Sequence, residues 1–174
     1  MIAATSAEVT QIPERILLTI GTVVFVIAMF ALMRKGWLRK ISSQSEIMQP
    51  LGVPADFVAD VSFTGRYLAS TQAGSWLSRI AVHGLGVPAR CIIESSHAGL
   101  VLKRDSADAF FIPRRDLISI RADRAIAGKA FEKDGIAVLT WKLGDTFIDS
   151  GFRADTTQQH IDFLSLDVLQ ESAK

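Results

Sequence analysis

The feature that most constrains this chain is an uninterrupted apolar segment close to its N-terminus. Residues 16–33, with the sequence ILLTIGTVVFVIAMFALM, contain no charged side chain. Eighteen helical residues span about 27 Å, which is close to the ~30 Å hydrocarbon core of a bilayer. Because core helices of soluble proteins are seldom apolar on every face over such a length, the segment predicts one transmembrane helix over residues 16–35.

The charges on either side of this segment predict its orientation. Residues 1–15 hold two glutamates and one arginine, and we expect them to form a short extracytoplasmic N-terminus that is not a cleaved signal peptide. The positive-inside rule then places the N-terminus outside the cell and the large C-terminal part in the cytoplasm, as a single-pass protein of the cell membrane. The cations that carry this argument, and that we expect to face lipid headgroups, are Arg34, Lys35, Arg39 and Lys40.

The rest of the chain provides for a linker and one domain. Residues 36–59 form a basic juxtamembrane segment and linker, because Pro50 and Pro54 interrupt any helix that continues from the membrane. Residues 60–174 are enough for one compact core. The net charge of +1 and the 49% hydrophobic content argue against a nucleic-acid binder and against a disordered chain. A single cysteine, Cys91, excludes an internal disulfide.

Short runs of β-forming residues, separated by turn residues, predict antiparallel strands from residue 61 onward. Residues 61–69 alternate in the way that a half-buried strand requires. Ser75 precedes Trp76, Leu77 and Ile80 at helical spacing, which predicts a short helix that contains residues 76–80 and ends near His83-Gly84. Further strands are expected at residues 90–95, 100–104, 110–112, 117–122, 136–142 and 146–152.

The pattern changes to helical after Arg153. Asp155 or Thr156 can cap a C-terminal helix, and Ile161, Leu164 and Val168 recur at the spacing of one buried face. About seven antiparallel strands and one closing helix give a mainly β fold, a pleckstrin-homology-like partial barrel preceded by one transmembrane helix.

The whole chain resembles a family of actinobacterial single-pass membrane proteins that have a cytoplasmic pleckstrin-homology-like domain and are often described as transporters or export proteins. The resemblance implies this fold and this topology, and it brings no established biochemical activity with it. The residues that carry it are Gly65-Arg66-Tyr67, Thr71, Gly74 to Ile80, His83 to Gly86, Ile112-Pro113, Ala127-Gly128-Lys129, Thr140-Trp141 and Gly151-Phe152-Arg153.

Motifs for catalysis, cofactors or metals are not recognisable in the sequence. The Ala127-Gly128-Lys129 stretch lacks the first glycine and the final Ser or Thr of a phosphate-binding loop. The three histidines are widely spaced and lack the paired spacing of a helical zinc site. We therefore expect no enzyme activity, no cofactor and no bound metal.

Two sets of cations are candidates for binding. The first set lies at the ends of predicted elements within the stretches that carry the resemblance, and it predicts a partner-binding rim: Arg79, His83, Lys129 and Arg153. The alternative is that these are structural ion pairs, with Arg153 bound to Asp149 or Asp155. The second set, which could face anionic lipid or form surface salt bridges, contains Arg114, Arg115, Arg121 and Arg124.

These observations favour a membrane-anchored cytoplasmic interaction module, a scaffold or adaptor whose partner protein is unknown. The alternative is a domain that senses anionic lipid. An accessory role in a transport or export system is less favoured, because one helix without an ionisable residue cannot build a transport pathway by itself.

Overall fold

The computed structural model describes residues 12–42, 44 and 46–166, and these fall into two compact units, Met1–Ser42 and Ser43–Lys174. The expected extracytoplasmic segment lies almost entirely outside the described residues, as does Val168. The two units are described separately.

The first unit is the helix α1 (Ile12–Ser42). Its segment Arg15–Arg39 is long and apolar enough to cross a membrane, and its side chains are exposed. The hydroxyls of Thr19 and Thr22 donate to carbonyls one turn back, at 2.8 Å in each case, so these polar groups are satisfied inside an apolar segment. The helix continues beyond the predicted end at residue 35, through the basic cluster.

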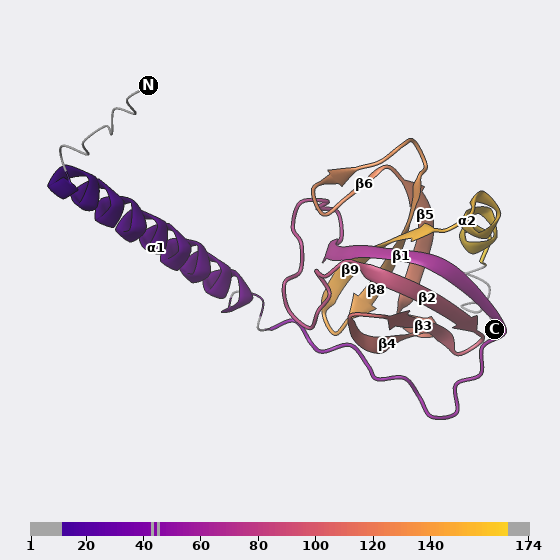
Figure 1. Ribbon diagram of the computed structural model, residues 1–174. Helices are drawn as coiled ribbons and strands as arrows, with labels where there is room; N and C mark the ends of the chain where they lie inside the picture. The colour runs from indigo at the N-terminus through magenta and orange to yellow at the C-terminus, as the bar shows by residue number, and fades with distance from the viewer. Residues whose placement is uncertain (1–11, 43, 45, 167–174) are drawn as a thin grey trace, which may run out of the picture. The chain divides into compact units, whose positions relative to one another are not determined.

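The second unit is built on a seven-stranded antiparallel sheet with the order β4-β3-β2-β1-β9-β8-β5 (Figure 1). The expected mainly β fold is confirmed. The strands are β1 (Val61–Gln72), β2 (Ala89–Ser96), β3 (Gly99–Arg104), β4 (Ala107–Pro113), β5 (Leu117–Asp123), β8 (Ile136–Leu143) and β9 (Thr146–Ala154).

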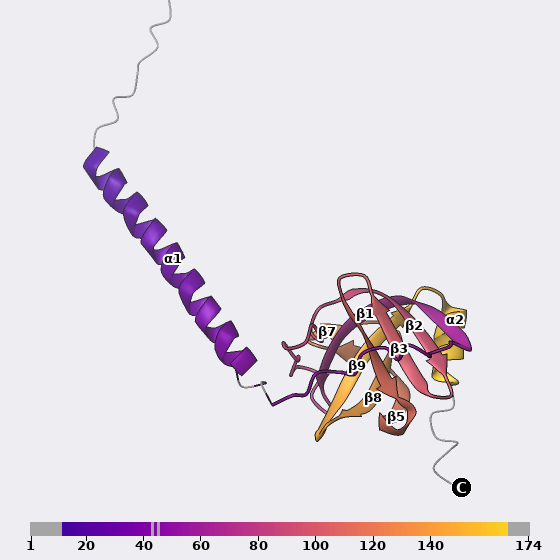
Figure 2. The ribbon, with the colours of Figure 1, turned by 90° about the horizontal axis from the view of Figure 1, so that it is seen from below.

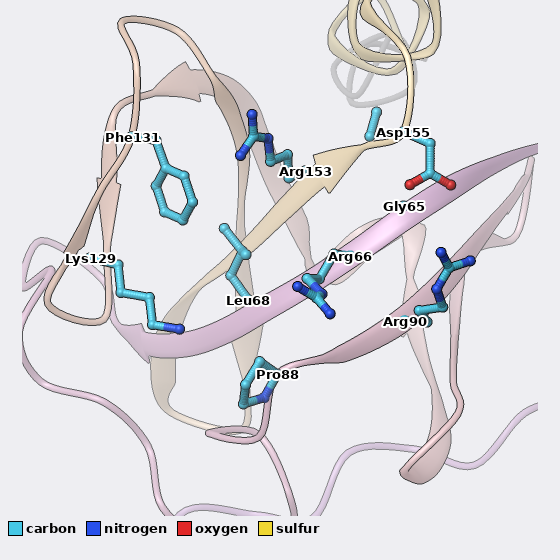
Figure 3. A pocket seen from close by; sticks show the side chains of 10 residues that line it. Gly65, Arg66, Leu68, Pro88, Arg90, Lys129, Phe131, Arg153 and Asp155 are labelled. Atoms are coloured by element: carbon cyan, nitrogen blue, oxygen red, sulfur yellow. The ribbon is translucent and has the colours of Figure 1, made fainter.

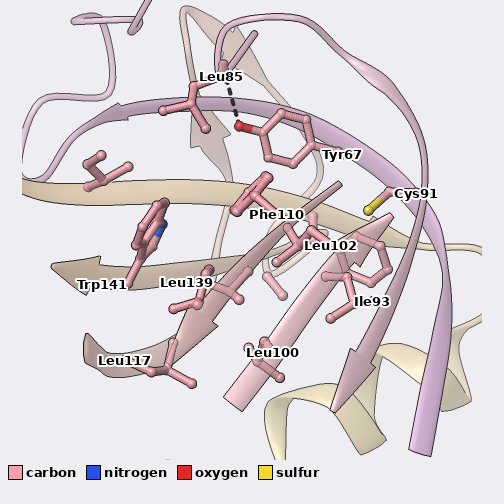
Figure 4. Packing of buried hydrophobic residues seen from close by; sticks show 14 of the residues in the cluster. Tyr67, Leu85, Cys91, Ile93, Leu100, Leu102, Phe110, Leu117, Leu139 and Trp141 are labelled. Atoms are coloured by element: carbon pink, nitrogen blue, oxygen red, sulfur yellow. Dashed lines mark hydrogen bonds between the residues drawn. The ribbon is translucent and has the colours of Figure 1, made fainter. Parts of the chain in front are cut away.

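The sheet bends around the main core: Figure 2 shows the curved strands, and Figure 4 shows buried side chains of the core. Phe110 lies on the edge strand β4 and Trp141 lies on β8, yet their rings stack with centroids 5.8 Å apart. Such a contact between strands far apart in the sheet order requires strong curvature. A chain of buried hydrogen bonds crosses this core: Trp141 Nε1 donates to Ser150 Oγ at 2.8 Å, Ser150 Oγ lies 2.6 Å from Ser70 Oγ, and the Tyr67 hydroxyl donates to the Leu85 carbonyl at 2.7 Å.

A small hairpin packs on the opposite face of the sheet. It consists of β6 (Ala125–Ile126) and β7 (Lys129–Ala130), which lie between β5 and β8 in the sequence and form a separate two-stranded sheet. Ile126 forms a second cluster with Leu68, Ile136 and Val138. The close approach needs Gly151, because a Cβ at that position would lie 2.8 Å from Ile126 Cγ2. The hairpin therefore raises a wall on the outer face of the sheet.

The closing helix α2 (Thr157–Leu164) is present, and Leu164 packs partly buried against the main core as expected, but the fully buried residue of the helix is a different one. Thr156 is the N-cap, and its hydroxyl accepts from the backbone N–H of Gln159 at 3.2 Å. Phe163 is fully buried, with its ring between those of Phe63 and Phe152 at 5.1 and 5.2 Å. The prediction for Ile161 was wrong, since its side chain is 54% exposed. The sequence spacing predicted a stripe of aliphatic residues, but Phe163 packs against two aromatic rings of the sheet. Contacts between aromatic rings stabilise more than the buried area alone implies.

The short helix expected over residues 76–80 is also wrong. Turns occupy this stretch, and an isolated bridge joins Thr71 to Arg79. The Ser75 hydroxyl donates to the Ser78 hydroxyl at 2.9 Å and does not cap a helix. Gly74 adopts a φ of 79°, which is a turn conformation. The apolar spacing suggested a helix, but the turns leave the side chains of Trp76 and Leu77 exposed.

The middle of the expected linker, between Gln44 and Leu51, contacts the domain. Ile47 is 7% exposed and belongs to the main core. The Gln44 side chain accepts from the backbone N–H of Ala81 at 2.7 Å and donates to the carbonyl of Arg79 at 3.2 Å. Leu51 forms an antiparallel bridge with Phe111. These contacts fix the chain on the domain before β1 begins.

Candidate functional site

The most unusual polar feature of the domain is a row of three arginines on the outer face of the sheet. In the register of the sheet, Arg66 of β1 lies opposite Arg90 of β2 on one side and opposite Arg153 of β9 on the other. Directly opposite residues of antiparallel strands place their side chains on the same face, with Cβ atoms about 5 Å apart. All three side chains are exposed. We call Arg66, Arg90 and Arg153 the arginine row.

The arginine row lines a pocket of about 670 Å³. The hairpin forms one wall and contributes Lys129, while Phe131 follows directly after the hairpin (Figure 3). Leu68 and Pro88 add apolar surface to the same pocket. The pocket thus combines four cations with an apolar wall, and we call it the basic pocket.

Carboxylates near the basic pocket neutralise it only in part. Glu132 Oε1 lies 2.6 Å from Arg153 Nη2, and both side chains are about half exposed or more, at 61% and 48%. The guanidinium of Arg153 also lies 5.8 Å from the centroid of the Phe131 ring. Asp155 lines the pocket, and no cationic side chain of the described residues lies within 4.0 Å of it. Within the described residues, Arg66, Arg90 and Lys129 have no carboxylate within 4.0 Å.

A second surface lies at the tip of the hairpin, where it meets the loop after β1. The backbone N–H of Gly128 donates to the Trp76 carbonyl at 3.0 Å, and Arg79 Nη2 donates to the Ala127 carbonyl at 3.3 Å. Trp76 is 50% exposed and Leu77 is 63% exposed. We call the loop of residues 73–79 together with the hairpin tip of residues 127–129 the apolar rim.

The structure separates the four residues that the sequence grouped as partner-binding. Lys129 and Arg153 line the same basic pocket. Arg79 lies at the apolar rim, where it bonds the hairpin. His83 Nε2 donates to the Ile47 carbonyl at 2.8 Å, so this histidine holds the incoming chain. Of the alternative pairings, Arg153 uses Glu132 and neither of the two aspartates considered.

Sequence reasoning missed Arg66 and Arg90. Alternation along residues 61–69 does place Arg66 on the face opposite Phe63 and Tyr67, which is a correct local signal. The strand register brings Arg66 beside Arg90 and Arg153, and one sequence does not give that register.

The second set of cations does not form one cluster. Arg114 and Arg115 lie on a short 3-10 helix, η1 (Arg114–Asp116), between β4 and β5. Arg121 Nη2 lies 2.8 Å from Asp149 Oδ2, and Arg121 Nε lies 3.7 Å from Asp123 Oδ2. Burial alone would raise the pKa of Asp149, but hydrogen bonds from Arg121 and Thr140 outweigh it, so the pKa of this carboxyl lies below its ordinary value. Arg121 is therefore used for a structural ion pair.

Burial changes the ionisation of two reactive groups in the core, the thiol of Cys91 and the hydroxyl of Tyr67. Cys91 is 3% exposed, and burial raises the pKa of its thiol to about 12, so it is a small core residue at neutral pH. Burial likewise raises the pKa of Tyr67 to about 12. Among the described residues, no group of three or more His, Cys, Asp or Glu side chains lies close enough to hold a metal.

Comparison with known proteins assigns the domain. The family model described as "Bacterial PH domain-like" matches residues 47–166. The match begins at Ile47, where the chain enters the core, and it ends just after α2. No curated protein matches the chain. The match covers more than half of the chain and the fold agrees with it, so the chain belongs to the bacterial PH domain-like family.

Proposed function

We propose that this protein is a membrane-anchored interaction module, in which α1 spans the cell membrane and the PH-like domain recruits a partner protein on the cytoplasmic side. PH-like domains generally serve as protein-interaction or lipid-binding modules. The apolar helix supports the anchor. The four cations after residue 33 support the cytoplasmic position of the domain.

The observation that carries the proposal is the apolar rim. Trp76 and Leu77 expose large apolar side chains on a loop that is held in place by backbone and side-chain hydrogen bonds to the hairpin. An ordered, exposed tryptophan in a loop that also contains Arg79 has the composition of an interaction hot spot. Because the loop is already ordered, a partner loses little loop entropy on binding.

The experiment compares partner recovery from membranes with two matched variants of the full-length protein. The double variant Trp76→Ala with Leu77→Ser removes the apolar rim. The control variant Val58→Ser with Ile161→Ser alters two other exposed apolar residues, which are 75% and 54% exposed. After crosslinking in intact cells, we expect the rim variant to lose its specific partner and the control variant to retain it. Equal recovery with both variants would refute the proposal.

The sidedness of the domain is tested separately with a phosphatase fused after Lys174. A cytoplasmic domain keeps this reporter inactive, since the enzyme requires export to fold. Neutral replacement of Arg34, Lys35, Arg39 and Lys40 is expected to weaken or invert the orientation. An active reporter on the unaltered protein would place the domain outside the cell.

A second candidate function, the sensing of anionic lipid, is favoured by one observation. Trp76 and Arg124 line the same pocket of about 630 Å³, and a tryptophan beside a cation suits the interface of an anionic bilayer. In the same crosslinking experiment, loss of a lipid adduct with retention of every protein adduct in the rim variant would favour lipid sensing over a protein partner.

A further inference from the structure

The arginine row is costly for the fold that contains it. Like charges that lie directly opposite each other across antiparallel strands destabilise a sheet. Arg66 has such a neighbour on both sides, and the hairpin adds Lys129 to the same pocket. A row of this kind is expected where function, and not folding, determines the side chains.

The acids that surround the row leave it with a net positive charge. Four cations and one carboxylate, Asp155, line the pocket, and Glu132 reaches Arg153 from outside the lining. The Arg153 pair is exposed and therefore weak. Two guanidinium groups and one ammonium group thus remain without a carboxylate partner among the described residues.

The shape of the basic pocket suits a small ligand. Its volume of about 670 Å³ lies within the roughly 300–1,000 Å³ range of small-molecule sites. Phe131 and Leu68 offer apolar contact beside the cations, as Figure 3 shows. A ligand that fills the pocket therefore has a strongly anionic end and an apolar or ring-containing body.

We propose that the basic pocket binds a phosphate ester. A carboxylate has two oxygens and is satisfied by one arginine, whereas a phosphate offers three terminal oxygens and up to two negative charges. Neighbouring strands lie about 4.8 Å apart, so the forks of adjacent arginines reach one phosphate group from two sides while Lys129 adds a point charge. The phosphate belongs either to a soluble compound or to a lipid headgroup. This inference does not rest on the apolar rim, because only Lys129 is common to both surfaces.

Titration calorimetry on the full-length protein in a neutral detergent, with inorganic pyrophosphate as the probe, tests the site. We expect saturable binding that weakens as salt is added. The double variant Arg66→Gln with Arg90→Gln should lower the affinity by about tenfold or more, as expected for lost hydrogen bonds to a charged group. The control variant Arg114→Gln with Arg115→Gln removes the same charge outside the pocket and should change the affinity by less than about twofold.

The melting temperature separates loss of binding from loss of folding. The Arg66→Gln, Arg90→Gln variant should melt at the same temperature as the unaltered protein or higher, because like-charge repulsion is removed. A lower melting temperature would assign the row a structural role and overturn the proposal. The proposal would also be overturned if pyrophosphate does not bind, or if the control variant loses as much affinity as the double variant. Binding of poly-glutamate without any binding of pyrophosphate would overturn it too.

Displacement of pyrophosphate identifies the source of the phosphate. Displacement by phenyl phosphate in solution, a phosphate ester with a ring-containing body, supports a soluble phosphate ester. Displacement only by phosphatidic acid in mixed micelles, with phosphatidylcholine micelles as the control, supports a lipid headgroup. The rim variant should bind pyrophosphate normally, so the phosphate site and the protein-partner proposal can fail independently.

Discussion

Two arginine-containing sites of the same sheet differ sharply in how their charge is balanced. Arg121 bonds Asp149 at 2.8 Å, and Thr140 Oγ1 donates to the same carboxylate at 2.6 Å. In the arginine row, Arg66 faces only other arginines in the register. The first site shows how this fold stabilises a cation that it needs for structure. Arg66 lacks the carboxylate partner, among the described residues, that a structural role would bring.

The largest effect is expected at the balanced site. Asp149→Ala removes hydrogen bonds from a guanidinium and a hydroxyl, so the free energy of unfolding should fall by about 2–3 kcal/mol. Urea denaturation of residues 43–174, which form their own compact unit, measures it. Asp155→Ala is the matched control and should cost less than about 0.5 kcal/mol, because no cation in the part of the chain that the structure describes pairs with this carboxylate of the basic pocket. Equal losses would erase the contrast between the two sites.

A fall in pH should reduce the contribution of Asp149 to the stability of the domain. The folded pKa of Asp149 lies below its ordinary value of 3.8, so the unfolded chain binds the proton more readily. The contribution of Asp149 to stability is therefore complete above pH 3.8 and is lost as the pH falls through the lower folded pKa. Between about pH 5 and about pH 3, the unaltered domain should lose more stability than Asp149→Asn. Equal losses would show that other carboxylates cause its acid sensitivity.

The sequence predicted those parts of the fold that depend on local pattern. Alternation and tight turns predicted all seven strands of the main sheet, because both signals act over a few neighbouring residues. The helix at residues 76–80 failed, because the spacing of Trp76 and Leu77 resembles a helical face while the turns leave both exposed. Phe163 was missed, since its pocket is formed by rings from β1 and β9, far away in the sequence.

The site was predictable only in part, for a related physical reason. Lys129 and Arg153 stand in stretches that carry a family resemblance, so the sequence could single them out. Their convergence with Arg66 and Arg90 depends on two strand registers and on a hairpin that packs over Gly151. The sequence pattern predicts which face of the sheet a strand residue occupies, but it does not predict which residue of the neighbouring strand lies opposite it.

A smaller effect of opposite sign is expected in the arginine row itself. Arg66→Gln keeps a polar side chain and removes repulsion from two neighbours, so the free energy of unfolding should rise by about 0.2–1 kcal/mol. Arg115→Gln is the control, because this side chain is 82% exposed and lies outside the sheet. A fall in stability on Arg66→Gln, with no change in the control, would mean that Arg66 has a stabilising contact and that the row is structural.

The smallest effect on stability is expected from Glu132→Gln, which also tests whether Arg153 binds an anion in the basic pocket. Glu132 bonds Arg153 in an exposed pair, so its loss should change the free energy of unfolding by less than about 0.5 kcal/mol. The same change frees the Arg153 guanidinium for an anion in the basic pocket and removes a nearby negative charge. Affinity for pyrophosphate should therefore rise by about twofold, which corresponds to the loss of an exposed pair of about 0.5 kcal/mol. Asp134→Asn, in the turn before β8, removes one negative charge outside the pocket lining and controls for net charge. If both variants raise the affinity equally, the gain reflects overall charge, and Arg153 is not a direct ligand of the anion.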